Sequence, residues 1–247
     1  MESELSIAAV LFDKDGTLID FDLTWGPATY EVIKTLARGD EALARRQSEV
    51  LHFDWDVRRF RSTSPLIGGS SADYGPGWAK ALGRDDVAVL KLEIDALTAA
   101  ESLRALTPIG DPKGVLENLF ELGLRLGVAT NDSEAGARRQ IHALGIQTRV
   151  EFIAGYDSGY GRKPEPGMIL AFARHCGLRP HEIAMVGDTR HDLDAARAAG
   201  AVAVAVLSGP AGRADLEPFA DHVLAEISEL PRLFEGLNPT TRISRAG

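Results

Sequence analysis

Four short segments of this sequence carry side chains that could do chemistry together. They are FDKDGTL (12–18), ATND (129–132), GRKPEP (161–166) and GDTRHDL (187–193). The residues of interest are two acids, a hydroxyl with its neighbouring amide, a lysine and two further acids: Asp13, Asp15, Thr130, Asn131, Lys163, Asp188 and Asp192. Clustered carboxylates favour a hard cation with oxygen ligands. We therefore expect Mg²⁺ as cofactor, with Asp13 and Asp188 as direct ligands.

A carboxylate can also act as a nucleophile toward phosphorus, through an aspartyl-phosphate. A phosphate ester is anionic, and two unit charges 4 Å apart repel by about 4 kcal/mol at an effective dielectric of 20. Mg²⁺ and Lys163 would offset that repulsion, and the Thr130 hydroxyl with nearby backbone N–H groups could hold the phosphoryl oxygens. Asp15 could protonate the leaving alkoxide and later activate water.

The elements that must position these residues are short apolar strands. Five runs have β-type composition: Ile7–Phe12, Leu126–Thr130, Phe152–Ala154, Ile183–Val186 and Ala201–Val206. Helical patterns at 115–123, 167–177 and 192–200 separate the last four, which predicts βαβ units and a parallel sheet covered on both faces. Ligands of such sheets bind beyond the carboxyl ends of the strands, where the four segments begin.

The pattern changes between the first strand and residue 107. Stretches such as ATYEVIKTLARG look helical, no clear strand occurs, and a Gly/Ser-rich piece at 67–77 reads as a loop. We predict an α/β fold with a Rossmann-like parallel-sheet core and an inserted helical cap domain. The expected domains are 1–19 with 108–237 for the core, 20–107 for the cap, and a polar tail at 238–247.

Composition narrows the classes of partner. The chain has 247 residues, a formal net charge of −9, 45% hydrophobic residues and 1 cysteine. The acidic balance argues against a nucleic acid or an anionic membrane surface. No run has the roughly 18 apolar residues of a membrane span, and the first residues lack a signal-peptide pattern. We expect a cytoplasmic protein whose partner is a small phosphorylated metabolite; its oligomeric state is open.

The four motifs together resemble those of the haloacid dehalogenase superfamily, and most closely its phosphoglycolate-phosphatase-like members with a helical cap after the first motif. The likeness covers Ile7 to Leu18 and about Pro108 to Leu230. It implies that Asp13 is the nucleophile and Asp15 the general acid/base. It also implies phosphoryl binding by Thr130 and Lys163, a role we extend to Asn131.

The same resemblance implies a metal site made of Asp13, the backbone carbonyl of Asp15, and Asp188, with Asp192 supporting it. Dehalogenating relatives lack the second acid, so Asp15 favours phosphoryl chemistry. We expect hydrolysis of a small phosphomonoester, with 2-phosphoglycolate as the family-level substrate. Two alternatives stay open: phosphoryl transfer within a sugar phosphate, as in β-phosphoglucomutase-like relatives, and a non-catalytic binding protein.

Three positions near the motifs call for separate expectations. Lys14 stands where many relatives have an apolar residue; we expect it to point away from the site, with a role in charge balance as the alternative. Asp20 is followed by Phe21 where relatives often have a serine, so substrate contacts there are open. Asp132 is interpreted as a helix N-cap.

Within the cap, Arg58, Arg59 and Arg61 form either a solvated helix face or a contact for a second anionic group of the substrate. The glycine-containing 67–77 loop could approach the site. Three tryptophans could line the pocket, although packing the cap's own core is the favoured use: Trp25, Trp55 and Trp78.

Overall fold

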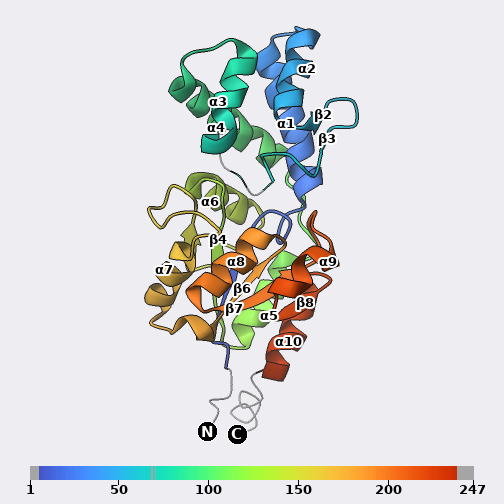
Figure 1. Ribbon diagram of the computed structural model, residues 1–247. Helices are drawn as coiled ribbons and strands as arrows, with labels where there is room; N and C mark the ends of the chain where they lie inside the picture. Colours follow the sequence, from blue (N-terminus) through green and yellow to red (C-terminus); the bar gives the residue numbers. More distant parts are fainter. Residues whose placement is uncertain (1–5, 68, 70, 238–247) are drawn as a thin grey trace, which may run out of the picture. The chain divides into compact units, whose positions relative to one another are not determined.

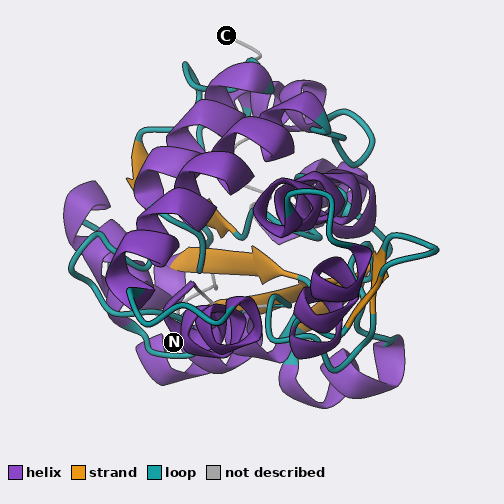
Figure 2. Cartoon of the chain, turned by 90° about the horizontal axis from the view of Figure 1, so that it is seen from above, coloured by secondary structure: helices purple, strands orange, loops and turns teal. Residues whose placement is uncertain are grey.

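The computed structural model describes residues 6–67, 69 and 71–237. These residues divide into two compact units, one formed by the chain up to Ile19 and from Pro108 onward, the other by Asp20–Thr107. Figure 1 traces the strands and helices of each unit, and Figure 2 shows helices in purple around the orange strands.

The first unit is built on a six-stranded parallel sheet in the order β5-β4-β1-β6-β7-β8. The strands are β1 Ala9–Phe12, β4 Arg125–Ala129, β5 Phe152–Ala154, β6 Ile183–Gly187, β7 Val202–Val206 and β8 His222–Leu224. The predicted α/β fold with a Rossmann-like parallel sheet is confirmed. Because β1 lies between β4 and β6, the chain leaves the middle of the sheet in both directions, which places a ligand crevice beyond its carboxyl end.

Helices cover both faces of this sheet. They are α5 Pro112–Glu121, α6 Glu134–Ala143, α7 Gly167–Cys176, α8 Arg190–Ala199, α9 Arg213–Leu216 and α10 Leu230–Leu237, with short 3₁₀ turns at Pro180–Glu182, Glu217–Phe219 and Ile227–Glu229. Alternate strand residues such as Leu11 and Met185 pack with Phe172 of α7 and Leu193 of α8 in one apolar core. Burial on both faces explains why the strands have continuous apolar sequences.

The second unit consists of α1 Phe21–Ala37, α2 Glu41–Val50, α3 Ser71–Leu82 and α4 Val87–Arg104, with a hairpin of β2 Phe53–Asp54 and β3 Arg59–Phe60. Its core includes Trp78, which is 1% exposed and donates a hydrogen bond from Nε1 to Gln47 Oε1 at 2.7 Å. Trp55 stacks on Tyr30 with ring centroids 4.3 Å apart. These two tryptophans therefore pack against neighbours within the second unit.

Several details of the second unit differ from expectation. The hairpin was not predicted, because strands of two residues leave no periodic signal. The 67–77 segment is not all loop: α3 begins at Ser71 and contains Pro76, since burial of Trp78 and Ala79 outweighs the poor helix propensity of glycine and proline. The three arginines predicted on a helix face lie instead in or beside the β2–β3 hairpin: Arg58, Arg59 and Arg61.

Candidate active site

The first predicted strand ends directly in the site. β1 stops at Phe12, and Asp13 continues it through a backbone hydrogen bond from its N–H to Val186 O at 2.8 Å. Asp13 is 6% exposed. A buried carboxylate at this position needs a cation or a proton, because an isolated buried charge is strongly disfavoured.

Lys163 supplies the nearest positive charge. Its Nζ lies 2.5 Å from Asp13 Oδ1, 2.7 Å from Asp192 Oδ1, and donates to Ala129 O at 3.0 Å. The lysine is 5% exposed. It therefore joins the end of β4 to acids that follow β1 and β6, which are far from it in the sequence.

Asn131 fixes the backbone of Lys163. The Lys163 N–H donates to Asn131 Oδ1 and Asn131 Nδ2 donates to Lys163 O, both at 2.9 Å. The peptide bond between Lys163 and Pro164 is cis. Both ends of the Asn131 side chain are thus used to hold the lysine, so this side chain acts on the site through Lys163.

The fourth motif supplies two more buried acids. Asp188 follows β6, and Thr17 donates a hydrogen bond from Oγ1 to its Oδ1 at 3.2 Å. Asp192 lies in the first turn of α8, where its Oδ2 accepts from Thr189 N at 3.0 Å and from Thr189 Oγ1 at 2.7 Å. Its Oδ1 lies 2.7 Å from Lys163 Nζ and accepts no other hydrogen bond among the described residues.

Close backbone approach shapes the surroundings of Asp188. A Cβ added at Gly16 would lie 2.2 Å from Asp188 Oδ2, and one at Gly209 would lie 1.8 Å from the same atom. Ser208 donates from Oγ to Gly16 O at 2.7 Å, which ties the loop after β7 to the first motif. Glycine is therefore required at both positions for steric reasons.

The electrostatics of the cluster are unbalanced. One carboxylate oxygen from each of Asp13, Asp188 and Asp192 lies within 4.8 Å of the others, while Lys163 is the cation in contact with Asp13 and Asp192. Burial raises the pKa of Asp13 to about 7, against the attraction of Lys163. Burial, followed by the charges of Asp13 and Asp192, raises the pKa of Asp188 well above its usual value.

These residues fit a divalent cation. Three ionised carboxylates and one ammonium leave a formal charge of −2 (−3 + 1), which a divalent ion would neutralise. Oxygen donors are the ligands that hard cations such as Mg²⁺ prefer. Burial works against Lys163 carrying its charge, but Asp13 and Asp192 outweigh this and raise its pKa, so the lysine stays cationic beside the acids.

The remaining predicted residues lie around this cluster. Thr130 is buried at the end of β4, with its Oγ1 accepting from the Asp132 N–H at 3.1 Å. Asp15 pairs through Oδ2 with Lys14 Nζ at 2.7 Å. The expectation that Lys14 points away from the site is therefore wrong, because its ammonium contacts the proposed acid/base.

Asp132 does not cap the following helix. Ser133 is the N-cap of α6, and its Oγ accepts from Gly136 N at 3.2 Å. Asp132 instead accepts from the Ser133 N–H and places Oδ2 at 3.2 Å from Lys14 Nζ. A serine one residue later competes successfully for the capping position, since its short hydroxyl reaches the same backbone donors.

The motifs and fold agree with a family model described as haloacid dehalogenase-like hydrolase, which matches residues 7–200. The chain belongs to this hydrolase family. A phosphoglycolate phosphatase of Rhodospirillum rubrum is 31% identical over 204 residues, covering 81% of this chain and 79% of the relative.

Solved structures show the same fold over nearly the whole chain of this hydrolase. A HAD phosphatase from Thermococcus onnurineus matches with a TM-score of 0.67 and 26% identity, covering 93% of this chain and 99% of the other. A candidate β-phosphoglucomutase from Thermotoga maritima has a TM-score of 0.67 at 20% identity, with coverage of 93% and 99%. The fold alone therefore does not separate a phosphatase from a mutase.

Sequence reasoning missed four residues that this hydrolase brings to the site. Thr17 and Gly209 contact or crowd Asp188, Ser208 holds the Gly16 carbonyl, and Gln140 accepts a hydrogen bond from Lys14. Thr17 lies within the first motif, so its role as a hydroxyl donor could have been predicted from the sequence. The other three lie outside all four motifs, so only the fold reveals them.

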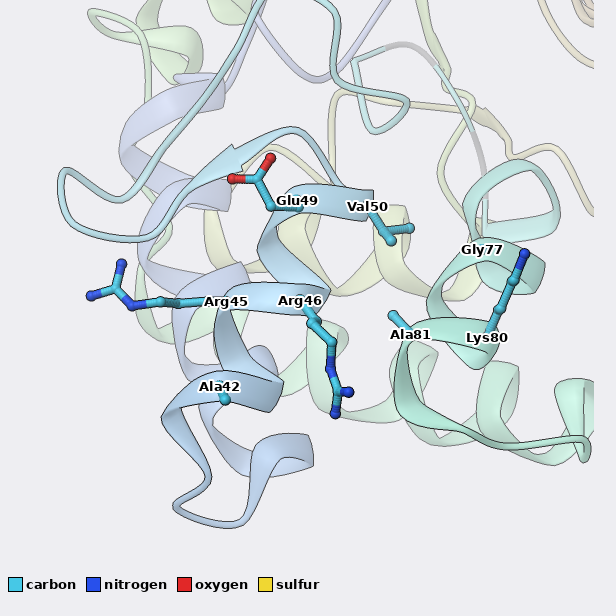
Figure 3. A pocket seen from close by; sticks show the side chains of 8 residues that line it. All are labelled: Ala42, Arg45, Arg46, Glu49, Val50, Gly77, Lys80 and Ala81. Carbon is cyan, nitrogen blue, oxygen red and sulfur yellow. The ribbon is translucent and has the colours of Figure 1, made fainter.

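A second gathering of charged side chains lies within the helical unit. A hollow of about 590 Å³ lies between α2 and α3 and is lined among others by Arg45, Arg46, Glu49 and Lys80. Figure 3 shows the side chains that line it. Arg45 pairs with Glu41 at 2.9 Å, and about half of its side chain is exposed.

Among the residues described here, no helix has the length and apolarity needed to cross a bilayer.

Proposed function

We propose that this hydrolase is a Mg²⁺-dependent phosphatase that cleaves a small phosphomonoester of the phosphoglycolate type through an aspartyl-phosphate on Asp13. The observation that carries the proposal is the placement of the Asp13 carboxylate, buried at the end of β1 and 2.5 Å from the Lys163 ammonium. Similarity to phosphoglycolate phosphatases supports the choice of substrate class.

Lys163 and Thr130 would bind the phosphoryl oxygens. The ammonium offsets the charge of the incoming phosphate, and Asn131 holds the lysine backbone in place. The Thr130 hydroxyl already accepts from Asp132 N–H, which leaves its hydrogen to donate. A ligand held this way presents its phosphorus to Asp13.

In the first step an oxygen of Asp13 forms a bond to phosphorus while the ester P–O bond breaks, and Asp15 gives a proton to the leaving alkoxide. In the second step water attacks the phosphorus and Asp15 takes its proton. The bond between Asp13 and phosphorus then breaks, and inorganic phosphate leaves. The two acids return to their starting states.

A divalent ion would be held by Asp13, the backbone carbonyl of Asp15, and Asp188, with Asp192 fixing Lys163 and the Thr189 turn beside them. When bound, it would supply positive charge between the carboxylates and the phosphate. Burial and the neighbouring carboxylates raise the pKa values of Asp13 and Asp188, so positive charge bound between these acids would favour their ionised forms.

The test is phosphate release from 2-phosphoglycolate, sugar phosphates and nucleoside monophosphates, with Mg²⁺ and with a chelator, for the wild type and Asp13→Asn. We expect Mg²⁺-dependent release that Asp13→Asn abolishes, with 2-phosphoglycolate among the best substrates. Isomerisation of a sugar phosphate without net phosphate release would instead establish the mutase. A folded protein that binds Mg²⁺ and converts none of these esters would overturn the proposal.

A further inference from the structure

Lys14 is a buried lysine between the two acids of the first motif. Its side chain has no exposed surface, and Nζ lies 2.7 Å from Asp15 Oδ2 and 3.2 Å from Asp132 Oδ2. It also donates to Gln140 Oε1 at 2.6 Å. Burying a lysine in this way removes its ammonium from water, which costs solvation free energy. Its position therefore calls for an explanation.

The contacts join three separate parts of the first unit. Asp15 belongs to the turn after β1, Asp132 to the loop after β4, and Gln140 to α6. The two acids are partly open to solvent, with 18% and 25% of their side chains exposed, whereas Lys14 has none. The lysine therefore lies beneath two carboxylates that reach the surface of the crevice.

Gln140 shows that this arrangement is specific. It is 1% exposed, its Oε1 accepts from Lys14, and its buried Nε2 has no hydrogen-bond partner within the described part of the chain. Leaving a buried amide N–H unsatisfied costs on the order of 1–3 kcal/mol. The contact with Lys14 therefore fixes the orientation of the Gln140 amide, although this orientation leaves the Nε2 donor of the same side chain unused.

We propose that Lys14 is a positioning residue that holds one oxygen of the Asp15 carboxylate and thereby orients this acid for proton transfer to the leaving group. The inference rests on the proposed phosphatase function. Lys14 itself needs no contact with substrate, because its effect passes through Asp15.

The leaving group distinguishes this role from a merely structural one. An alkoxide needs a proton as the ester bond breaks, whereas p-nitrophenolate leaves without one. The ratio kcat/KM reports the formation of the phosphoenzyme and not its later hydrolysis. A defect in orienting Asp15 must therefore lower kcat/KM for an alkyl phosphate much more than for p-nitrophenyl phosphate.

The experiment measures kcat/KM for 2-phosphoglycolate and p-nitrophenyl phosphate in the wild type, Lys14→Met, Asp15→Asn and the double variant. Proton transfer contributes about 10²–10⁴-fold to such reactions. For Lys14→Met we expect a loss on the order of 10–100-fold with the alkyl ester and less than about threefold with the aryl ester. In the Asp15→Asn background, Lys14→Met should cause no further loss.

Two further variants keep the test decisive. Lys113→Met removes the same charge from an exposed lysine of α5 and should change neither value. Gln140→Met keeps Lys14 but removes one of its partners, and should reproduce the selective loss on a smaller scale if Lys14→Met does not fold.

Equal losses on both esters, or a full additional loss in the Asp15→Asn background, would overturn the role of Lys14 while leaving the phosphatase intact. A wild type that releases phosphate from neither ester, or an Asp13→Asn variant as active as the wild type, would overturn the proposed function and this inference with it.

Discussion

Ion pairs of similar length occur in both units of this hydrolase, in opposite surroundings. In the first unit Lys163 pairs with Asp13 and Asp192 at 2.5 and 2.7 Å, and all three side chains are buried. In the second unit Arg61 pairs with Glu49 at 3.1 Å, with 48% and 67% of the two side chains exposed. Distance alone therefore does not distinguish a functional pair from a solvated one.

Burial and charge balance make the difference. Exposed pairs gain little, because water solvates either ion nearly as well as its partner does. Buried ions lose that solvation, and an excess of carboxylates such as that of the site persists only where protons or a cation neutralise it. The imbalance at the site points to a ligand, whereas the exposed pair of Arg61 with Glu49 in the second unit gives no such indication.

The largest expected effect comes from Asp13→Asn. Loss of the proposed nucleophile should lower kcat at least about a thousandfold. Stability should not fall with it, because a neutral amide removes repulsion from Asp188 and Asp192. Phosphate release and thermal unfolding without divalent ions check both statements. A variant that is inactive but also unfolded would not count in favour of the nucleophile.

Lys163→Met should be the most destabilising change at the site. It leaves Asp13 and Asp192 buried without their counter-ion, and breaking a buried pair from one side costs about 3–5 kcal/mol. Urea unfolding at pH 7 measures the loss, with Lys113→Met as the exposed control. Adding Asp192→Asn should restore part of the stability; a full additional loss would contradict the electrostatic explanation.

The pH dependence of stability tests the charge imbalance directly. Burial raises the pKa of Asp13 from its ordinary value of 3.8 to about 7, so the folded protein holds this proton more tightly than the unfolded chain does. The resulting stabilisation is complete below pH 3.8 and is lost as the pH rises toward 7. At about 1.4 kcal/mol per pKa unit, the total is of the order of 4 kcal/mol.

The measurement compares the metal-free wild type with Asp13→Asn between pH 4 and pH 8. We expect the unfolding free energy of the wild type to decline relative to the variant across this range. Mg²⁺ should stabilise the wild type increasingly as the pH rises, since protons and metal compete for the same oxygens. A pH-independent difference between the two proteins would argue against a perturbed Asp13.

Asn131→Ala should have an intermediate effect. It removes two hydrogen bonds that hold the Lys163 backbone, each contributing about 0.5–1.5 kcal/mol. Because the lysine would lose its position and keep its charge, we expect KM for the phosphate ester to rise and Mg²⁺ stabilisation to persist. Unchanged KM would show that Asp13 and Asp192 position Lys163 without help.

The sequence predicts the buried region better than the exposed one. Strands such as β6 are continuous apolar runs because both faces are covered, and catalytic residue types follow them in linear motifs. β8 is three half-buried residues at the sheet edge, and α6 has no apolar stripe in EAGARRQIHA, so neither gave a signal. The order of strands and the hairpin also needed the structure.

Within the site, residue types were predictable but partners were not. Asn131 and Lys163 are 32 residues apart, and Lys14 and Gln140 are 126 apart. Neither pairing has a periodic or spacing signal, because it arises from the way strands and helices pack. The role of Lys14 in the first motif therefore becomes interpretable only when the structure shows its partners, Asp15, Asp132 and Gln140.

The smallest effect is expected in the second unit. Arg61→Ala removes the pair with Glu49 from a surface where both ions are already solvated, so the thermal midpoint should stay within experimental error. If Arg61 instead contacts a second anionic group of the substrate, KM for 2-phosphoglycolate should rise while KM for p-nitrophenyl phosphate stays constant. A large loss of stability in this variant would remove the contrast between the two units, because exposed and buried pairs would then carry comparable free energy.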